Sequence, residues 1–400
     1  MPGNLRSRLK RIQQVKKEDA AVHNDGGIDF SYFTGQGWVS AGYLTLRREM
    51  TAGGDMTLPE IMPEAAGIVM PGINSTTAYE DMLFFDLETT GLSGGAGTLA
   101  FLAAFGRFIA AGSAGPEAVR YKLRITQYLL LDYPGENNFV EAMLGEFKRD
   151  NTIVSYNGKS FDSQILKTRC LMNGMIPPEY RHADLLHSAR RLWKRILPDC
   201  SQGTIETAIL GIDRAGDIPG AMAPEIWFSF LKNGAANGAV DALAGIADHN
   251  RRDITGLASI FCAMTRIAAD PFTAMKTINF DLESLAIRWH TLNSTTGQKI
   301  LQYAAETGCP RAGLHYALAL LKQKKYDEGR KWLERTASAG QPPPLQAAAL
   351  RALAIDSEHR LKNTAEALSF TEQALELLVG VQILPGEKAN SLSCKELRSF

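Results

Sequence analysis

Met82-Leu-Phe-Phe-Asp-Leu-Glu88 is a compact apolar run that ends in acids, and this composition predicts a buried strand. The turn-rich stretch Thr89-Thr-Gly-Leu-Ser-Gly-Gly-Ala-Gly97 follows it, and residues 98–109 and 120–131 predict two further strands. Three consecutive strands joined by turns favour an antiparallel meander. Short apolar pieces and several glycines in residues 30–72 indicate hairpins or an irregular segment before the meander.

Helices dominate the pattern after the meander. An amphipathic pattern over residues 136–148 predicts a helix, and residues 152–156 predict a short buried strand. Residues 161–173 predict a second helix. This succession of strands and helices indicates an α/β domain. Three more helices are expected near residues 184–194, 203–210 and 242–267.

The chain after Asp270-Pro271 has little strand signal, so a domain boundary is expected at that proline. The segments that start at Asp327 and Ala365 have matching small and large positions 38 residues apart, close to the tetratricopeptide period. Two tetratricopeptide-like repeats and a plain helical bundle are both consistent with this pattern. The expected helices there are 314–323, 326–339, 343–354 and 364–379. The predicted domains are a basic tail (1–28), an α/β domain (29–270, core 82–267) and a helical domain (271–400).

The composition is that of a globular protein with two or three domains. The 400 residues are 22% charged and 45% apolar, which excludes collagen-like, coiled-coil and wholly disordered chains. Lys+Arg and Asp+Glu are equal at 43 each, so any affinity for nucleic acid must come from local patches. One such patch is the N-terminal segment, where six Lys/Arg precede the first acid. This segment is either a solvated tail or an arm that binds phosphate groups.

Several features favour a cytoplasmic protein. The five cysteines are scattered without a Cys-x-x-Cys pair, which argues against a disulfide framework or a zinc knuckle and favours a reducing cytosol. The most apolar stretch, residues 99–112, is interrupted by Gly106 and Arg107 and is too short to cross a bilayer. The basic, polar start has no apolar core of an export signal. We therefore expect a cytoplasmic location and no membrane anchor.

Asp86 and Glu88 are two positions apart on the first predicted strand, so their carboxylates project from one face. Two like charges at a strand end repel each other, and burial raises both pKa values unless a cation neutralises them. Oxygen ligands without clustered cysteines or histidines favour Mg²⁺ or Mn²⁺ over zinc. A pair of solvated acids at a strand end is the alternative.

Three further residues are candidates for a site. Asp162 lies in the first turn of its predicted helix, where the helix dipole alone also favours an acid. The preceding Gly158-Lys-Ser160 resembles the end of a phosphate-binding loop, but Ile153 stands where that loop requires glycine. Asp253 falls on the apolar stripe of a helix, where an acid needs a partner or a metal ion. His249, one turn earlier, is either a structural histidine or a general base.

Together these residues resemble the three sequence blocks of the DEDD 3′–5′ exonucleases, which have an RNase-H-like fold. The resemblance runs from about Met82 to Met264 and is closest to the bacterial YprB-like branch. That branch includes mitomycin-repair exonucleases acting beside a superfamily 2 helicase, and a tetratricopeptide-like tail fits it. The matching blocks are Phe85-Asp-Leu-Glu-Thr-Thr-Gly-Leu-Ser-Gly-Gly-Ala-Gly-Thr98, Tyr156-Asn-Gly-Lys-Ser-Phe-Asp162, His182-Ala-Asp-Leu-Leu-His187, Arg190-Arg-Leu-Trp-Lys194, Arg214-Ala-Gly-Asp-Ile-Pro-Gly220 and His249-Asn-Arg-Arg-Asp-Ile254.

The resemblance implies a mixed RNase-H-like sheet flanked by helices, and two-metal hydrolysis of a phosphodiester at the 3′ end. Asp86 would bind both ions, with Glu88 and Asp253 completing one site and Asp162 holding the second ion through water. His249 would orient or deprotonate the attacking water. The histidine type of the family has its His five residues before the last Asp, and the tyrosine type has a Tyr four before. His249 stands four residues before Asp253, which is a departure from both types.

Cationic side chains beside the acids would position the nucleic acid. The candidates are Lys159, His187, Arg190, Arg191, Lys194, Arg251 and Arg252. Four of them fall on one broad helical face, for which a solvated surface is the alternative. The arginine pair adjoins His249, and Lys159 is close to Asp162 in the chain.

Three function classes stay open. The first is a metal-dependent 3′–5′ exonuclease in repair, with DNA preferred to RNA because the resembling branch acts in DNA repair. An endonuclease of the RNase H or resolvase kind would share the carboxylates and the fold. A non-catalytic adaptor would bind nucleic acid and present its helical repeats. In each case a superfamily 2 helicase or another protein would bind the helical domain.

Overall fold

The computed structural model describes residues 31–381, apart from 61–62, 74–76, 92–96, 116–117, 235, 237 and 293. The predicted basic tail and part of the glycine-rich segment after Gly91 lie outside the described residues. The chain forms two compact units. The first unit comprises residues 1–60, 70–186 and 201–265, and the second comprises 61–69, 187–200 and 266–400. The three predicted domain ranges stay predictions.

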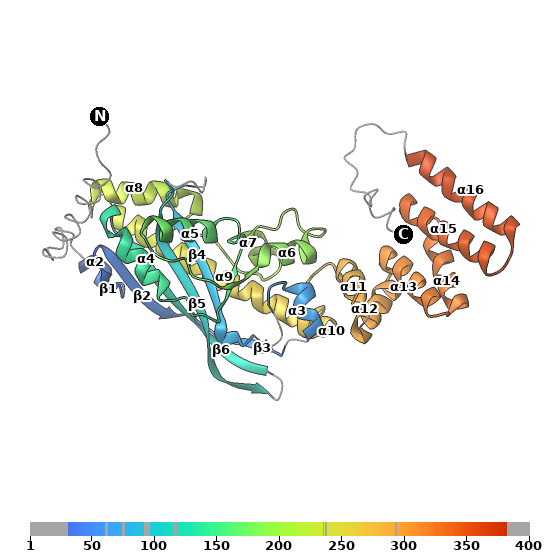
Figure 1. Ribbon diagram of the computed structural model, residues 1–400, viewed down its shortest axis with the longest axis horizontal. Coiled ribbons are helices and arrows are strands. Elements are labelled where there is room, and N and C mark those ends of the chain that lie inside the picture. Colours follow the sequence, from blue (N-terminus) through green and yellow to red (C-terminus); the bar gives the residue numbers. More distant parts are fainter. Residues whose placement is uncertain are drawn as a thin grey trace. The chain divides into compact units, whose positions relative to one another are not determined.

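The first unit is built on one mixed sheet of eight strands (Figure 1). Its order is β1-β2-β6-β5-β4-β7-β8, and β3 pairs with β6 outside this order. β4, β5 and β6 form the predicted antiparallel meander, while β7 and β8 continue in parallel on the other side of β4. The strands are β1 (Val39–Gly42), β2 (Thr45–Thr51), β3 (Met56–Pro59), β4 (Met82–Thr89), β5 (Ala100–Gly115), β6 (Ala118–Leu130), β7 (Thr152–Ser155) and β8 (Arg181–Asp184).

Helices flank this sheet, as the sequence predicts. They are α2 (Ser31–Thr34), α4 (Glu136–Leu144), α5 (Asp162–Met172), α7 (Gln202–Ala208), α8 (Ala223–Asn233) and most of α9 (Ala239–Ala269), with short 3₁₀ turns η1 (Tyr79–Asp81), η2 (Tyr133–Gly135) and η3 (Gly220–Met222). Strand β8 and helix α8 were not expected from the sequence. β8 has only four residues, and its charged residues leave no apolar run. The glycine and prolines around the start of α8 indicate a loop instead of a helix.

The alternation along β4 gives the strand two different faces. Leu83, Phe85 and Leu87 belong to a buried core cluster that includes Phe139 of α4. Phe84 points to the other face, where its ring centroid lies 5.5 Å from that of Phe261 in α9. Helix α9 also lies close to β5, because a Cβ added at Gly106 would be 2.7 Å from the Ile254 side chain. The face that carries Phe84, Asp86 and Glu88 is therefore covered by α9.

The second unit consists of helices. They are α3 (Pro63–Val69), the greater part of α6 (Leu185–Trp193), α10 (Pro271–Ala274), α11 (Leu282–His290), α12 (Thr295–Glu306), α13 (Pro310–Lys322), α14 (Tyr326–Ala337), α15 (Pro343–His359) and α16 (Thr364–Val381). Leu314, Leu333 and Leu353 share one core cluster. The last four helices agree with the predicted ones, and their tetratricopeptide-like character stays a prediction.

Helices α11 and α12 were not expected from the sequence. The sequence Thr295-Thr-Gly297 at the start of α12 has low helix propensity. The glycine is needed, however, because a Cβ at Gly297 would lie 2.6 Å from the carbonyl oxygen of Trp289 in α11. No described helix of the chain is long and apolar enough to cross a bilayer. Cys170, Cys200, Cys262 and Cys309 take part in no disulfide among the described residues, and Cys394 lies outside those residues.

Candidate active site

β4 holds the first two acids of the candidate site in the interior of the sheet. The strand is hydrogen-bonded to β5 on one side and to β7 on the other. Asp86 and Glu88 alternate with Phe85 and Leu87, so both carboxylates project toward the face that α9 covers. Glu88 is buried and Asp86 is half-buried. β5 pairs with β4 as far as Thr89, whereas β7 pairs only with residues 82–84. Asp86 and Glu88 are therefore held by β5 and lie just beyond the parallel pair.

A tight turn between β7 and α5 positions the third acid, Asp162. Asn157 in this turn has a positive φ of 63°. Both oxygens of Asp184 hold the turn, since Oδ1 accepts the N–H of Asn157 (2.8 Å) and Oδ2 accepts the N–H of Lys159 (3.1 Å). A Cβ at Gly158 would lie 2.7 Å from Asp162 Oδ2. The Gly158-Lys-Ser160 segment is therefore a structural turn that lets the Asp162 carboxylate pack against the backbone.

Helix α9 contributes His249 and Asp253, one turn apart. His249 Nε2 lies 3.2 Å from Asp253 Oδ2, and His249 Nδ1 lies 3.0 Å from Asp217 Oδ2. Glu88, His249 and Asp253 each offer one ligand atom, and these atoms all lie within 4.8 Å of one another. Elements far apart in the sequence thus bring nitrogen and oxygen donors into one small region.

The acids of this region repel one another. Burial raises the pKa of Asp86 well above its usual value, and the charges of Asp253 and Asp162 raise it further. Burial also raises the pKa of Glu88, with additional repulsion from Asp86, Asp253 and Asp162. Burial raises the pKa of Asp162 to about 7, and the charge of Asp184 adds to the effect. Asp162 and Asp253 are thus close enough to Asp86 and Glu88 for their charges to interact, and a cation among the four acids would offset this repulsion.

A chain of buried polar side chains holds Asp86 from the opposite side. Asn250 Nδ2 donates to Asp86 Oδ2 at 2.7 Å, and Gln127 Nε2 donates to Asn250 Oδ1 at 2.9 Å. Gln127 Oε1 accepts from Arg48 Nε at 2.7 Å, and the Arg48 guanidinium lies 4.6 Å above the Trp38 ring. Asn250 and Gln127 are fully buried. These hydrogen bonds fix which atom of the Asn250 amide faces Asp86. No pattern in the sequence indicates them.

Arg214 begins one of the sequence blocks that match the family, but the sequence indicated no role for it. Its guanidinium contacts three carboxylates: Glu206 at 2.5 Å, Asp253 at 2.7 Å and Asp217 at 2.8 Å. Glu206 is fully buried against α9, and a Cβ at Gly256 would lie 1.7 Å from its carboxylate. The ion pairs and hydrogen bonds lower the pKa of Asp217, although burial opposes them. The charged residues within the loop 211–219 were the only sequence signal for this cluster.

Three of the predicted nucleic-acid contacts lie in the same unit as the acids. Arg251 Nε and Arg252 Nε contact Asp248 at 2.7 Å and 3.0 Å. Arg252 Nη1 also lies 3.8 Å from Asp217 Oδ1. The Lys159 side chain is exposed. Arg251 and Arg252 are partly neutralised by acids of the same unit, and Lys159 is the most exposed of the three.

The other predicted contacts belong to α6 within the second unit. The side chains of His187, Arg190 and Lys194 are exposed there. Arg191 is half-buried, and its Nη1 donates to the carbonyl oxygen of Ile68 at 3.4 Å. Because α6 residues from His187 onward and the acids belong to different units, their joint action on one substrate stays a prediction.

Comparison with known proteins gives the family. The family model of the RNase_H superfamily matches residues 83–265, the segment that carries the four acids. A protein of Bacillus subtilis (strain 168), described as uncharacterized protein YprB, is 34% identical over 306 residues, which are 74% of this chain and 69% of the relative. The chain belongs to the YprB-like family of RNase-H-like proteins. Among solved structures, a complex of E. coli exonuclease I with a 5cy-dT13 oligonucleotide matches 74% of this YprB-like chain and 99% of its own, at 13% identity and a TM-score of 0.25. A likeness at that TM-score supports no conclusion.

The donor set of this YprB-like chain fits a hard divalent cation. Carboxylate oxygens of Asp86, Glu88, Asp162 and Asp253 outnumber the nitrogen of His249, which favours Mg²⁺ or Mn²⁺ over zinc. Burial and the charges of neighbouring carboxylates raise the pKa values of Asp86, Glu88 and Asp162, and a bound cation would offset both effects. The residues present therefore fit the metal ions that the fold implies.

Proposed function

We propose that this protein is a divalent-metal-dependent 3′–5′ exonuclease that hydrolyses phosphodiester bonds of DNA. Membership of an RNase-H-like family supports a nuclease as the general class. The observation that carries the proposal is the convergence of acids from β4, α5 and α9, where burial and the charges of Asp253 and Asp162 raise the pKa values of Asp86 and Glu88. Such crowding of carboxylates is expected of a site that works with bound cations.

The four acids have separate roles in this proposal. Asp86 contributes to both metal sites, Glu88 and Asp253 complete one of them, and Asp162 belongs to the other. Two bound cations would supply Lewis-acid stabilisation of the attacking and leaving oxygens. The chain's own contribution is to hold the acids in place: β5 pairs with the part of β4 that carries both acids, and the Asn250 amide fixes the orientation of the Asp86 carboxylate.

His249 is the proposed general base. In this proposal the protonated Nδ1 of the imidazole donates a hydrogen bond to Asp217 Oδ2, which lies 3.0 Å away. That contact leaves Nε2, on the side of Asp253, as the atom that accepts a proton from the attacking water. Asp217 is therefore a positioning residue for the base. His249 stands four residues before Asp253, and this spacing places both side chains on one face of α9.

The test is a nuclease assay with purified protein. Single- and double-stranded DNA and RNA carry a label at the 3′ or the 5′ end, and each reaction contains Mg²⁺, Mn²⁺ or chelator. We expect stepwise loss of the 3′ end that requires the divalent ion. Asp86→Ala should abolish hydrolysis, whereas Asp55→Ala, which removes an exposed acid, should leave it unchanged. Mg²⁺-dependent hydrolysis by Asp86→Ala at the wild-type rate would contradict the assignment.

One observation favours the non-catalytic adaptor as a second candidate. Both oxygens of Asp253 already have partners within the protein, Arg214 and His249. Isothermal titration with Mn²⁺ and with DNA separates the two proposals, because an adaptor would bind DNA without binding metal or hydrolysing the strand. Digestion of a closed circle would instead identify an endonuclease, since an exonuclease needs an end.

The wider setting is also a proposal. We place the enzyme in cytoplasmic DNA repair, with the helical second unit as the docking surface for a superfamily 2 helicase or another protein. The exposed cations of α6 would help to hold the nucleic acid. Replacing Arg190 and Arg191 by alanine should weaken DNA binding and flatten its dependence on salt concentration. If binding and its salt dependence stay unchanged, that helix face does not contact the nucleic acid and is simply exposed to solvent.

A further inference from the structure

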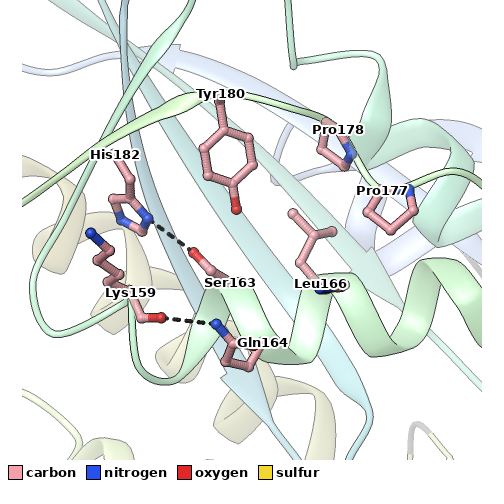
Figure 2. A pocket seen from close by; sticks show the side chains of 9 residues that line it. Lys159, Ser163, Gln164, Leu166, Pro177, Pro178, Tyr180 and His182 are labelled. Atoms are coloured by element: carbon pink, nitrogen blue, oxygen red, sulfur yellow. Dashed lines mark hydrogen bonds between the residues drawn. The ribbon is translucent and has the colours of Figure 1, made fainter.

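A cavity of about 250 Å³ lies beside the first turn of α5 in the first unit (Figure 2). Lys159 and Ser163, which line it, are the near neighbours of Asp162 on either side in the chain. The turn that positions the acid therefore also forms one wall of the cavity. The mechanism proposed above makes no use of this space.

One side of the cavity is polar and carries positive charge. Ser163 Oγ lies 3.2 Å from His182 Nδ1, and His182 Nε2 lies 2.7 Å from Ser155 Oγ. With both ring nitrogens engaged, His182 holds the Ser163 hydroxyl at the wall. Lys159 and Lys167 have exposed side chains at the rim, and none of the described lining residues is acidic. This charge pattern suits an anionic ligand.

The other side of the cavity is apolar and flat. The ring of Tyr180 stacks on Phe147 with centroids 5.5 Å apart and an interplanar angle of 26°. Figure 2 shows its hydroxyl pointing toward Ser163, with Leu166, Pro177 and Pro178 on the other side of the opening. An aromatic ring held in this way is a rigid surface for stacking, because its packing fixes its orientation before a ligand arrives.

We propose that this cavity binds one nucleotide of the single strand on which the acids act, with its base against Tyr180 and its phosphate at Lys159 and Lys167. The inference rests on the proposed function. A flat apolar wall beside a cationic rim matches a base and its phosphate. The volume is below the roughly 300–1,000 Å³ of pockets that hold drug-sized ligands, so the cavity admits one unit of the strand.

The first experiment measures binding by fluorescence anisotropy with chelator present, so that no hydrolysis occurs. The ligands are dTMP and a series of labelled oligothymidylates. Tyr180→Ala should weaken oligothymidylate binding by about 5- to 150-fold, the range expected for one stacked base. Tyr180→Phe should bind like wild type because it keeps the ring. Tyr43→Ala, which removes an aromatic ring that is 39% exposed elsewhere in the unit, is the matched control.

A second variant tests the phosphate contact. Replacing Lys159 and Lys167 by alanine should lower the slope of log Kd against log salt by about 0.7 for each lost phosphate contact on a single strand. Lys122→Ala removes an exposed lysine of β6 and should leave that slope unchanged. Photo-crosslinking of the wild-type protein to 5-iodouracil oligonucleotides, mapped by mass spectrometry, gives a readout that does not depend on how the variants fold. We expect the crosslink at Tyr180.

The outcomes separate this inference from the proposed function. Wild-type affinity in folded Tyr180→Ala, or a crosslink map without Tyr180, overturns the cavity assignment while metal-dependent hydrolysis stands. Binding of dTMP as tight as that of the oligonucleotides overturns the strand as the occupant and identifies a site for free nucleotides. A Tyr180 crosslink in a protein that never hydrolyses DNA supports the cavity and refutes the nuclease.

Discussion

Asn250 donates a hydrogen bond of 2.7 Å to Asp86 across 164 positions of the sequence. The bond joins α9 to β4 and directs the amide nitrogen of Asn250, not its oxygen, at the carboxylate. It lowers the pKa of Asp86 against the larger effects of burial and of the neighbouring acids. The Asp86 carboxylate is therefore oriented by a residue that carries no charge.

Gln127→Leu tests the chain behind that bond. The substitution removes the donor to Asn250 Oδ1 and to the Ala247 carbonyl, and the acceptor of Arg48 Nε. Each buried polar group left without a partner costs about 1–3 kcal/mol, so we expect the free energy of unfolding to fall by at least that amount. Urea denaturation measures it. Gln302→Leu, an exposed glutamine in α12, should change stability by less than about 0.5 kcal/mol.

Asp217→Asn tests how His249 is held. The variant keeps the size of the side chain and removes the carboxylate that faces Nδ1 and binds Arg214. We expect kcat to fall by about 10- to 100-fold with little change in KM, as for other residues that orient a catalytic group. Asp248→Asn, which alters an acid paired with Arg251, is the control. Equal kcat values for the wild type and Asp217→Asn would remove Asp217 from the mechanism.

The crowded acids predict an unusual response of stability to pH. The folded state keeps a proton on Asp162 from its ordinary pKa of 3.8 up to about 7, where the unfolded chain has already lost it. The metal-free protein should therefore lose stability as pH rises through this window, by at most about 1.4 kcal/mol per pH unit for each such group. Acids with lowered pKa values, such as Asp217, stabilise the folded state above pH 3.8, and this stabilisation is lost only as the pH falls below that value.

Thermal unfolding in chelator and in excess Mg²⁺ checks this prediction. Mg²⁺ should raise Tm more at neutral pH than at acidic pH, because it binds the ionised acids. Asp162→Asn should flatten the pH dependence in chelator. A metal-free Tm that stays constant or rises between about pH 5 and 7 would contradict the assigned repulsion.

Gly256→Ala should disrupt the cluster around Arg214. A Cβ at this position would overlap the buried Glu206 carboxylate, whose two oxygens are held by Gln202 and Arg214. We expect a loss of about 1–3 kcal/mol in the free energy of unfolding. Gly203→Ala in α7 has no atom within 4 Å of the new Cβ and should be neutral or slightly stabilising. Calorimetry of the two variants provides the comparison.

Local patterns in the sequence predict a large part of this fold. The apolar run that ends at Glu88 predicts β4, and the two strands after it complete the meander. The spacing of His249 and Asp253 places them one turn apart on α9. These signals succeed because the residues that make each contact pattern are neighbours in the chain.

Other parts of the site depend on partners far away in the sequence. Gln127 looks like an ordinary polar residue of a strand until Asn250, 123 positions later, is seen to accept its hydrogen bond. Glu206 and Arg214 belong to short helical and loop segments whose composition does not indicate burial. Their roles follow from the packing of α7 and the loop 211–219 on α9, which no local pattern contains.

The two edges of β4 are paired over different lengths, from Phe84 to Thr89 with β5 and over residues 82–84 with β7. The amides of β4 that bond to these strands should exchange with heavy water only when the sheet opens. Asp217 and Arg214 lie outside regular structure and are held mainly by side-chain ion pairs, so we expect the amides of their loop to exchange faster than those of β4. Hydrogen exchange would thus distinguish the part of the candidate site that the sheet holds from the part that the loop holds.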